Sequence, residues 1–207
     1  MDSSEFYIGW MSKAPKSFAK HVKRVLLILL PLALVIGYLL ATNQRKFSTA
    51  NFEYGKTTEL TGIYHNDPVP LLKVYDNNRQ SITIPLVGYG KHGAETVIME
   101  IETENKISLD GKEVTLKGTL LYGDGKTILQ IDKNDKPVVS IGSGSTFSIE
   151  EKDLGIQTIR GEIVDPKCYF GVMKPGEGKV HRDCAIRCIL GGIPPVLHVQ
   201  NEKGESN

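Results

Sequence analysis

An uncharged apolar run lies near the N-terminus of this chain, at residues 25–41 (VLLILLPLALVIGYLLA). With Thr42 and Asn43, the run is long enough to cross the hydrocarbon core of a bilayer as one helix. A helix in a soluble core shows a polar face, and a cleavable signal peptide has a shorter apolar stretch followed by small residues. This run has neither property. We therefore expect an uncleaved, single-pass transmembrane helix over residues 25–43.

The charges on either side of this run predict its orientation. Only Arg45 and Lys46 follow it closely, whereas five basic residues precede it: Lys13, Lys16, Lys20, Lys23 and Arg24. By the positive-inside rule, residues 1–24 form a basic cytoplasmic N-terminus, and the chain lies outside the membrane from a linker at 44–56 onward. The lipid bilayer is then an expected partner. In the whole chain Lys plus Arg is 25 and Asp plus Glu is 24, a balance that gives no sign of nucleic-acid binding.

After the linker, the pattern changes to short, β-branched, alternating segments separated by turns. We predict strands at 59–64, 71–75, 81–87, 96–102, 114–122, 127–131 and 159–165. Gly62, Gly118 and Gly161 interrupt three of them, and a glycine within a strand marks a bend of the kind that turns the corner of a small barrel. The expected fold is therefore mainly β: an OB-like barrel or a sandwich over residues 57–155, with one short C-terminal helix.

A glycine-rich segment, Gly88-Tyr-Gly-Lys-His-Gly93, follows one of these strands. Glycine-rich loops bind phosphate through backbone N–H groups when they join a strand to a helix and carry G-x-x-x-x-G-K-[ST]. This segment lacks that pattern, so we interpret it as a plain turn. His65 and His92 are isolated, and we expect each to be a surface or loop histidine rather than a ligand.

All three cysteines lie in a unit at residues 156–200, with the spacing C-x12-H-x2-C-x3-C. Residues 180–190 are predicted to form a short helix that stops at Gly191-Gly192. His181, Cys184 and Cys188 share one face of that helix, and Cys168 follows the end of the preceding strand. The four residues predict a tetrahedral Cys3His metal site. Four nearby basic residues are available to offset the thiolate charge: Lys167, Lys179, Arg182 and Arg187.

Several metals and one covalent alternative fit this spacing. Zn²⁺ suits four such ligands, and Cu⁺ also favours soft sulfur, with Met173 as a nearby thioether. A [2Fe–2S] cluster is less favoured because its ligands follow other spacings, and haem is not expected because no C-x-x-C-H occurs. Cysteines in an exported compartment usually pair, so a disulfide from Cys168 to Cys184 or Cys188 is the main alternative. Simple burial of the three thiols is the third.

Three strings in this unit carry a resemblance: GEIVDPKC at 161–168, HRDCAIRC at 181–188 and GGIPP at 191–195. Together they resemble a tract of a group of uncharacterised bacterial proteins, which are small exported or membrane-anchored β-domain proteins. The resemblance covers about a fifth of the chain. It implies a bacterial inner-membrane protein with a periplasmic C-terminal domain, and it implies that the four ligand candidates form one unit. It implies no activity.

The function we expect is that of a metal-binding or redox accessory protein in the envelope. Membrane tethering suits a partner that also lies in the membrane, such as a membrane-protein complex. An enzyme is not favoured, because no third group orients a Cys–His pair for catalysis. The alternatives are a thiol-disulfide or other Cys-dependent enzyme, and a structural interaction module with a disulfide. Residues 201–207 are expected to be a flexible tail.

Overall fold

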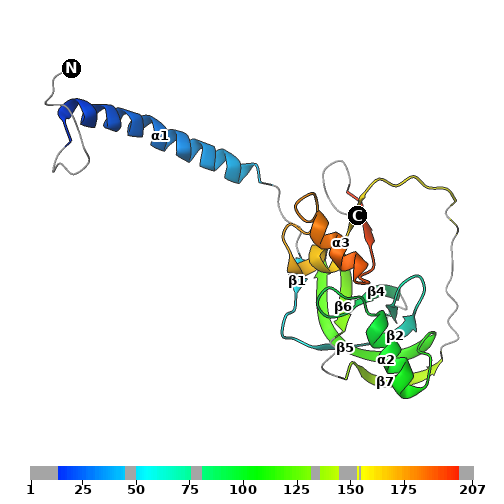
Figure 1. The fold of residues 1–207 in the computed structure, drawn as a ribbon. Coiled ribbons are helices and arrows are strands. Elements are labelled where there is room, and N and C mark those ends of the chain that lie inside the picture. The colour runs from blue at the N-terminus through cyan, green and yellow to red at the C-terminus, as the bar shows by residue number, and fades with distance from the viewer. Residues whose placement is uncertain are drawn as a thin grey trace. The chain divides into compact units, whose positions relative to one another are not determined.

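A computed structural model of the chain describes residues 14–44, 50–75, 81–131, 136–144, 153 and 155–200 (Figure 1). The chain divides into two compact units, Met1–Lys46 and Phe47–Asn207. Several predictions concern residues outside the described ranges: the flanking basic residues Lys13, Arg45 and Lys46, the turn at 76–78 and the tail at 201–207.

The described part of the first unit is one helix, α1 (Lys16–Thr42). Its 27 residues give a length of about 40 Å, which exceeds the hydrocarbon thickness of a bilayer, about 30 Å. None of its residues is buried, and the helix is long and apolar enough to cross a membrane. The predicted apolar segment lies within α1. The helix begins at Lys16 rather than at Val25, so the basic residues from Lys16 onward are helical too.

The second unit is built on a closed five-stranded barrel. β2 (Thr58–His65), β3 (Leu71–Tyr75) and β4 (Ser81–Val87) form an antiparallel meander, and β5 (Lys112–Gly123) pairs with β2. β6 (Lys126–Ile131) pairs antiparallel with β5 and parallel with β4, which closes the ring. This is the Greek-key arrangement of an OB-like barrel. The barrel prediction is therefore confirmed, and the alternative of an open sandwich is wrong.

Gly118 is the residue at which β5 changes its partner. It pairs with Thr58 of β2 in one ladder and with Ile131 of β6 in the next. A Cβ at Gly118 would lie 2.3 Å from the carbonyl oxygen of Gln130, so only glycine permits this close approach of the two backbones. Gly62 and Gly118 therefore lie in barrel strands as predicted, whereas Gly161 lies just before a strand rather than inside one.

The predicted strand at 96–102 is wrong, because these residues belong to a helix, α2 (Glu95–Asn105). The buried residues of α2 are Val97, Ile98 and Ile101, and this spacing places them on one helical face. These three residues pack into the barrel core. In the sequence, α2 lies between β4 and β5. Burial of one helical face thus outweighs the β-branched composition that favoured a strand.

Two strands that the sequence analysis does not predict extend the sheet along β5. β1 (Ala50–Phe52) pairs with the second half of β5, and β7 (Val138–Gly144) pairs with the first half. β1 lies inside the predicted linker at 44–56, so part of that linker belongs to the sheet. Because β5 is 12 residues long, it can pair with several strands along its two edges.

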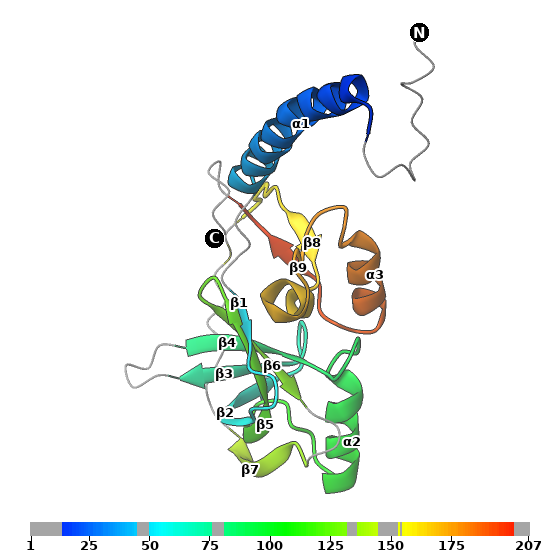
Figure 2. The ribbon, with the colours of Figure 1, turned by 90° about the vertical axis from the view of Figure 1, so that its left-hand side faces the viewer.

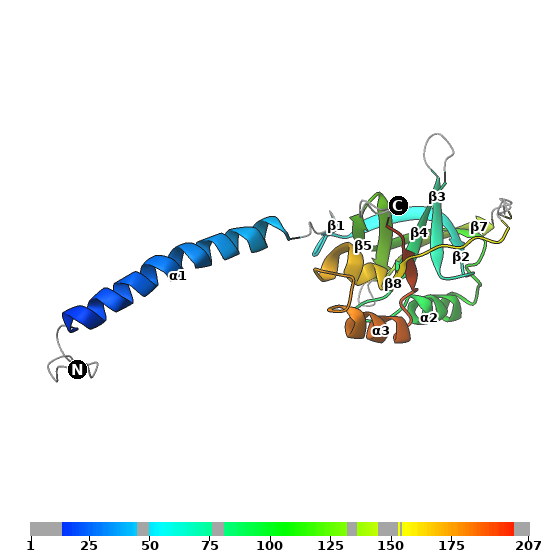
Figure 3. The same cartoon turned by 90° about the horizontal axis from the view of Figure 1, so that it is seen from above.

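The cysteines lie in a C-terminal group of four elements: β8 (Glu162–Val164), the π-helical turn η2 (Cys168–Val172), α3 (Arg182–Leu190) and β9 (Val196–His198). β8 and β9 form a separate two-stranded sheet, and α3 confirms the predicted C-terminal helix. Figure 2 shows this group at one end of the barrel, with α2 and β7 toward the other end. Figure 3 shows the irregular segment 155–161 that leads into β8.

The second unit has two hydrophobic cores. The first fills the barrel and includes Tyr64, Leu72 and Leu116. The second lies between the barrel and the C-terminal group, where Leu121 and Ile128 pack with residues that include Cys168 and Cys188. Because two of the cysteines belong to this second core, the barrel itself positions the cysteine unit.

Candidate metal centre

Cys168 is held by a capped turn that follows β8. One carboxylate oxygen of Asp165, Oδ1, accepts hydrogen bonds from the backbone N–H groups of Lys167 (2.9 Å) and Cys168 (3.4 Å). This is the geometry of a helix N-cap, and Pro166 occupies the first helical position, where its missing N–H does no harm. The chain then forms η2, which begins at Cys168. Asp165 and Pro166 therefore fix the position of Cys168 relative to the end of β8.

Tyr169 connects η2 by hydrogen bonds to the β5–β6 turn and to β9. Its hydroxyl group donates to Oδ2 of Asp124 in the β5–β6 turn (3.0 Å) and lies 2.9 Å from Nε2 of His198 in β9. Nδ1 of His198 lies 3.0 Å from a carboxylate oxygen of Glu177. These contacts connect the turn that carries Cys168 to the barrel and to the β8–β9 sheet.

Cys184 and Cys188 lie one turn apart on α3, as predicted. The helix ends in a Schellman motif, in which the N–H of Ile193 donates to the carbonyl of Cys188 (3.1 Å) and the N–H of Gly192 donates to that of Ile189 (3.0 Å). Gly192 has a φ of +94°, which glycine adopts without a Cβ penalty. The predicted stop at Gly191-Gly192 is confirmed, and it keeps the last turn around Cys188 regular.

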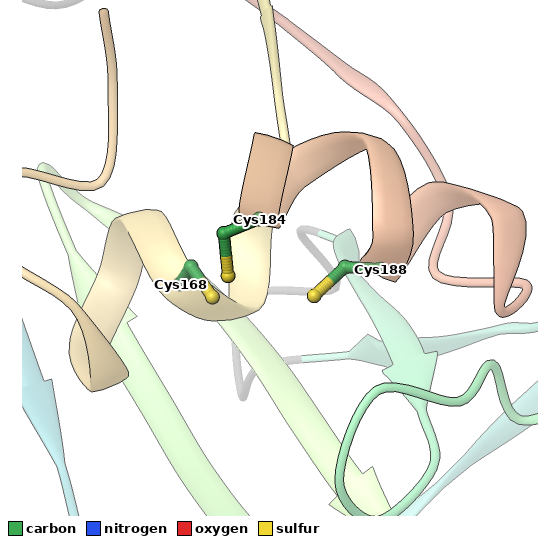
Figure 4. A group of neighbouring side chains, drawn as sticks. All are labelled: Cys168, Cys184 and Cys188. Atoms are coloured by element: carbon green, nitrogen blue, oxygen red, sulfur yellow. The ribbon is translucent and has the colours of Figure 1, made fainter. Parts of the chain in front are cut away.

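The three thiols converge between η2 and α3. Their Sγ atoms lie within 4.8 Å of one another, and Figure 4 shows the side chains pointing into a common space. Cys168 is 6% exposed, Cys188 is 1% exposed, Cys184 is half-buried, and all three are free. In a tetrahedral site with Zn–S bonds of about 2.3 Å, sulfur atoms stand about 3.8 Å apart. The three thiols are therefore close enough to bind one metal ion.

His181, which directly precedes α3, belongs to a different group. One of its ring nitrogens lies within 4.8 Å of Sγ of Cys168 and of a carboxylate oxygen of Asp165. Cys168 thus has two sets of neighbours: the other two cysteines, and the pair Asp165 and His181. A single Cys3His set that includes His181 stays a prediction.

Two buried polar atoms in this region have no hydrogen-bond partner within the described part of the chain: Oδ2 of Asp165 and Nε2 of His181. Asp165 is completely buried, and His181 is 3% exposed. Leaving a buried polar atom unpaired destabilises a fold by about 1–3 kcal/mol. Folding alone therefore gives no reason for this arrangement, whereas ligand binding does.

The electrostatic environment disfavours isolated thiolates. Burial, followed by the nearby carboxylate of Asp165, raises the pKa of the Cys188 thiol to about 12. The same causes raise the pKa of Cys168. Thiolates at these two positions require a compensating positive charge close by.

Lys167, one of the four basic residues predicted to offset thiolate charge, is buried at the site. It is 4% exposed, and its ammonium group donates to the carbonyl oxygens of Gly88 (2.8 Å) and Gly90 (2.7 Å). Burial lowers the pKa of Lys167 to about 8, and the nearby charge of Asp165 opposes this shift. The other three predicted residues are exposed: Lys179, Arg182 and Arg187.

The loop at 88–93, which the sequence analysis interprets as a plain turn, packs against the cysteine unit. The ammonium group of Lys91 donates to Sγ of Cys184 (3.6 Å), and the backbone N–H of Gly93 donates to the carbonyl of Gly191 (2.9 Å). A Cβ at Gly191 would lie 1.9 Å from the carbonyl oxygen of Lys91. Glycine is therefore required where this loop meets the end of α3.

Asp165 and Lys91 are the site residues that the sequence analysis misses. Asp165 carries a local signal, since an Asp-Pro pair before a helical turn is a typical capping sequence. Lys91 carries none, because tertiary packing alone brings it to Cys184. Met173 directly follows η2 with a side chain that is 44% exposed, and its use as a copper ligand stays a prediction.

The sequence matches no protein-family model, and searches of curated proteins and of solved structures found no match. The geometry of the cysteine unit is therefore the basis on which a function is assigned.

Proposed function

We propose that this chain is a membrane-anchored accessory protein whose OB-like domain binds a metal ion through Cys168, Cys184 and Cys188. The observation that carries the proposal is the convergence of three free thiols within 4.8 Å, from two separate elements. Sequence proximity alone does not produce this arrangement, because a loop separates η2, which carries Cys168, from α3, which carries the other two cysteines. Thiolates at this separation suit Zn²⁺ or Cu⁺.

Charge supports metal binding at this position. Three thiolates and one divalent ion leave one net negative charge, and two lysines lie beside the cluster. Lys91 contacts Cys184 directly. Lys167, the residue before Cys168 in the sequence, is buried. A tetrahedral ion needs a fourth donor, and water fills that position in open sites.

The thiol-enzyme alternative has less support. Reactive cysteines have a lowered pKa and stand in exposed, electropositive surroundings. Cys168 and Cys188 are buried, and the pKa of each thiol is raised. These two residues have the properties of ligands rather than of nucleophiles.

The anchor and its orientation complete the proposal. α1 carries its basic residues before the apolar run, which favours an N-terminus in the cytoplasm and the barrel on the outer side. The proposed location is therefore the bacterial inner membrane for the anchor and the periplasm for the barrel. A tethered metal site of this kind suits a metal-handling or redox role beside a membrane-protein complex.

Metal analysis of the full chain tests this function. The protein is purified in detergent under anaerobic conditions without added thiol reductant, and its zinc and copper are measured against protein. We expect at least about one ion per chain, a sharp loss of metal in Cys184→Ser, and full retention in the matched control Asp183→Asn, an exposed neighbour on α3. A metal-free protein contradicts the proposal. A quantitative disulfide from Cys168 then identifies a structural bridge, and free thiols identify simple burial.

A further inference from the structure

We infer that Asp165, Cys168 and His181 form a second metal site, for a borderline divalent ion such as Zn²⁺, and that the Cys168 thiolate bridges it to the ion held with Cys184 and Cys188. The inference rests on the proposed function, because the two sites share one ligand. It gives His181 a different role from the fourth ligand of a single Cys3His site.

The geometry for this site is already in place. A carboxylate oxygen of Asp165, Sγ of Cys168 and a ring nitrogen of His181 lie within 4.8 Å of one another, and all three residues are buried. They come from three places: the end of β8, the start of η2 and the residue before α3. Cys168 is the one residue that belongs both to this group and to the three-thiol group.

The two unpaired atoms supply the independent observation. Oδ1 of Asp165 is used by the capped turn, whereas Oδ2 is buried without a partner in the described chain, as is Nε2 of His181. A shared metal ion would satisfy both atoms at once. Purely structural residues at these positions would instead hydrogen-bond to the protein, as buried polar groups do in the great majority of cases.

The donor chemistry and the charge also fit two ions. Oxygen, sulfur and nitrogen donors together suit Zn²⁺, whereas three thiolates form a softer set. The two groups contain three thiolates and one carboxylate, four negative charges that two divalent ions neutralise. A single divalent ion leaves two of these charges, which Lys91 and Lys167 would then have to offset. Metal pairs that share ligands stand about 3.5–4 Å apart, which one bridging sulfur spans.

The second site also has a route from solvent. A cavity of about 470 Å³ lies between β8 and α3, and His181 forms part of its wall together with Ile163, Ala185 and Ile189. An ion enters a buried site only along such a path. Of the three proposed ligands, His181 is the one that lines this cavity.

Metal stoichiometry of a set of variants tests this inference. The full chain in detergent is loaded with Zn²⁺, freed of excess metal by gel filtration and analysed for zinc. We expect about two ions in the wild type and about one in His181→Ala, Asp165→Asn and Cys184→Ser, because each removes a ligand of one site only. Cys168→Ser is expected to lose both ions. His92→Ala, an exposed histidine in the barrel loop, is the matched control and keeps both.

Co²⁺ provides a second measurement that does not depend on the fold of any variant. Thiolate-to-cobalt charge-transfer absorption per chain reports sulfur ligation, and a thiolate bridge couples the spins of two Co²⁺ ions. We expect the electron paramagnetic resonance signal per cobalt to fall when the second equivalent is added to the wild type.

The outcomes separate this inference from the proposed function. One ion per chain that is lost in Cys184→Ser but kept in His181→Ala overturns the second site and leaves the three-thiol site standing. One ion whose affinity falls in both variants shows a single Cys3His site, which also overturns the inference. A wild type without metal overturns both proposals.

Discussion

The ammonium group of Lys91 lies 3.6 Å from Sγ of Cys184, although the two residues are 93 positions apart in the sequence. Lys91 belongs to a loop of the barrel, and Cys184 belongs to the C-terminal helix. This contact joins the two parts of the domain at one of the three converging thiols. The candidate metal centre therefore lies where the barrel loop meets the C-terminal helix, and changes in the loop are expected to alter metal binding.

Lys91→Met tests this contact. Removing the ammonium group is expected to weaken Zn²⁺ binding by about three- to tenfold, because Lys91 is exposed and solvent screens its charge. The thermal midpoint should change little. Competition with a chromophoric chelator measures the affinity, and Lys179→Met, an exposed lysine of the same charge, is the control. Equal affinities in the two variants would show that the Lys91 contact does not stabilise the bound ion.

Gly191→Ala tests the packing between the loop and the end of α3. The added Cβ would meet the carbonyl oxygen of Lys91 at 1.9 Å, so loop or helix must move, with a loss of about 2–3 kcal/mol in the free energy of unfolding. Gly142→Ala is the control, since its nearest neighbour lies at 3.3 Å. Thermal unfolding measured by circular dichroism should give a clearly lower midpoint for Gly191→Ala alone, together with weaker metal binding.

Asp165 has two separable roles, and a pair of variants divides them. Asp165→Ala removes the cap on the turn before Cys168 and is expected to destabilise the metal-free protein by about 1 kcal/mol. Asp165→Asn retains an acceptor for the same backbone N–H groups and should be closer to the wild type. Thermal midpoints with excess chelator provide the comparison. Identical losses in the two variants would mean that the charge, rather than the cap, stabilises the turn.

Metal affinity is expected to rise steeply with pH. The pKa of Cys188 is raised to about 12 and that of Cys168 is raised as well, so both thiols carry a proton near pH 7 in the metal-free protein. An ion must displace at least these two protons, which predicts an apparent affinity that increases about 100-fold per pH unit. Chelator competition between about pH 6.5 and 7.5, corrected for the protonation of the chelator, measures the slope. A flat profile would indicate preformed thiolates.

The anchor is tested by placing a charge at two depths of α1. Leu34→Arg puts arginine near the middle of the apolar run and disfavours membrane insertion by about 3 kcal/mol. Thr42→Arg puts the same charge at the end of the helix, where a long side chain reaches the interface. After alkaline extraction, Thr42→Arg should stay in the membrane fraction and Leu34→Arg should be depleted. Equal retention of the two variants would argue against a transmembrane position.

Local signals predict a good part of the fold. The β5–β6 hairpin follows from Gly123-Asp124-Gly125, and Asp124 and Gly125 indeed adopt positive φ values of 50° and 69°, as a tight hairpin turn requires. The helical stop at Gly191-Gly192 works in the same way. Each of these features depends on residues close together in sequence, so a pattern read along the chain detects them.

The helix α2 shows where such reading fails. Residues 96–102 contain β-branched and alternating apolar residues, and both properties favour a strand. The segment becomes a helix because the barrel core accepts Val97, Ile98 and Ile101 from one helical face. That core consists of strands that are distant in sequence, so the information is absent from the segment itself.

Local sequence patterns are enough to predict the apolar helix, the five strands of the barrel, and the placement of Cys184 and Cys188 on one helical face. Backbone geometry and hydrophobic periodicity act over a few neighbouring residues, so these features can be predicted from the sequence. Three other arrangements come from tertiary packing: β6 closes the barrel against β4, Lys91 contacts Cys184, and His181 lies beside Asp165. Those arrangements depend on the packing of distant segments around two shared cores, and no local pattern encodes them.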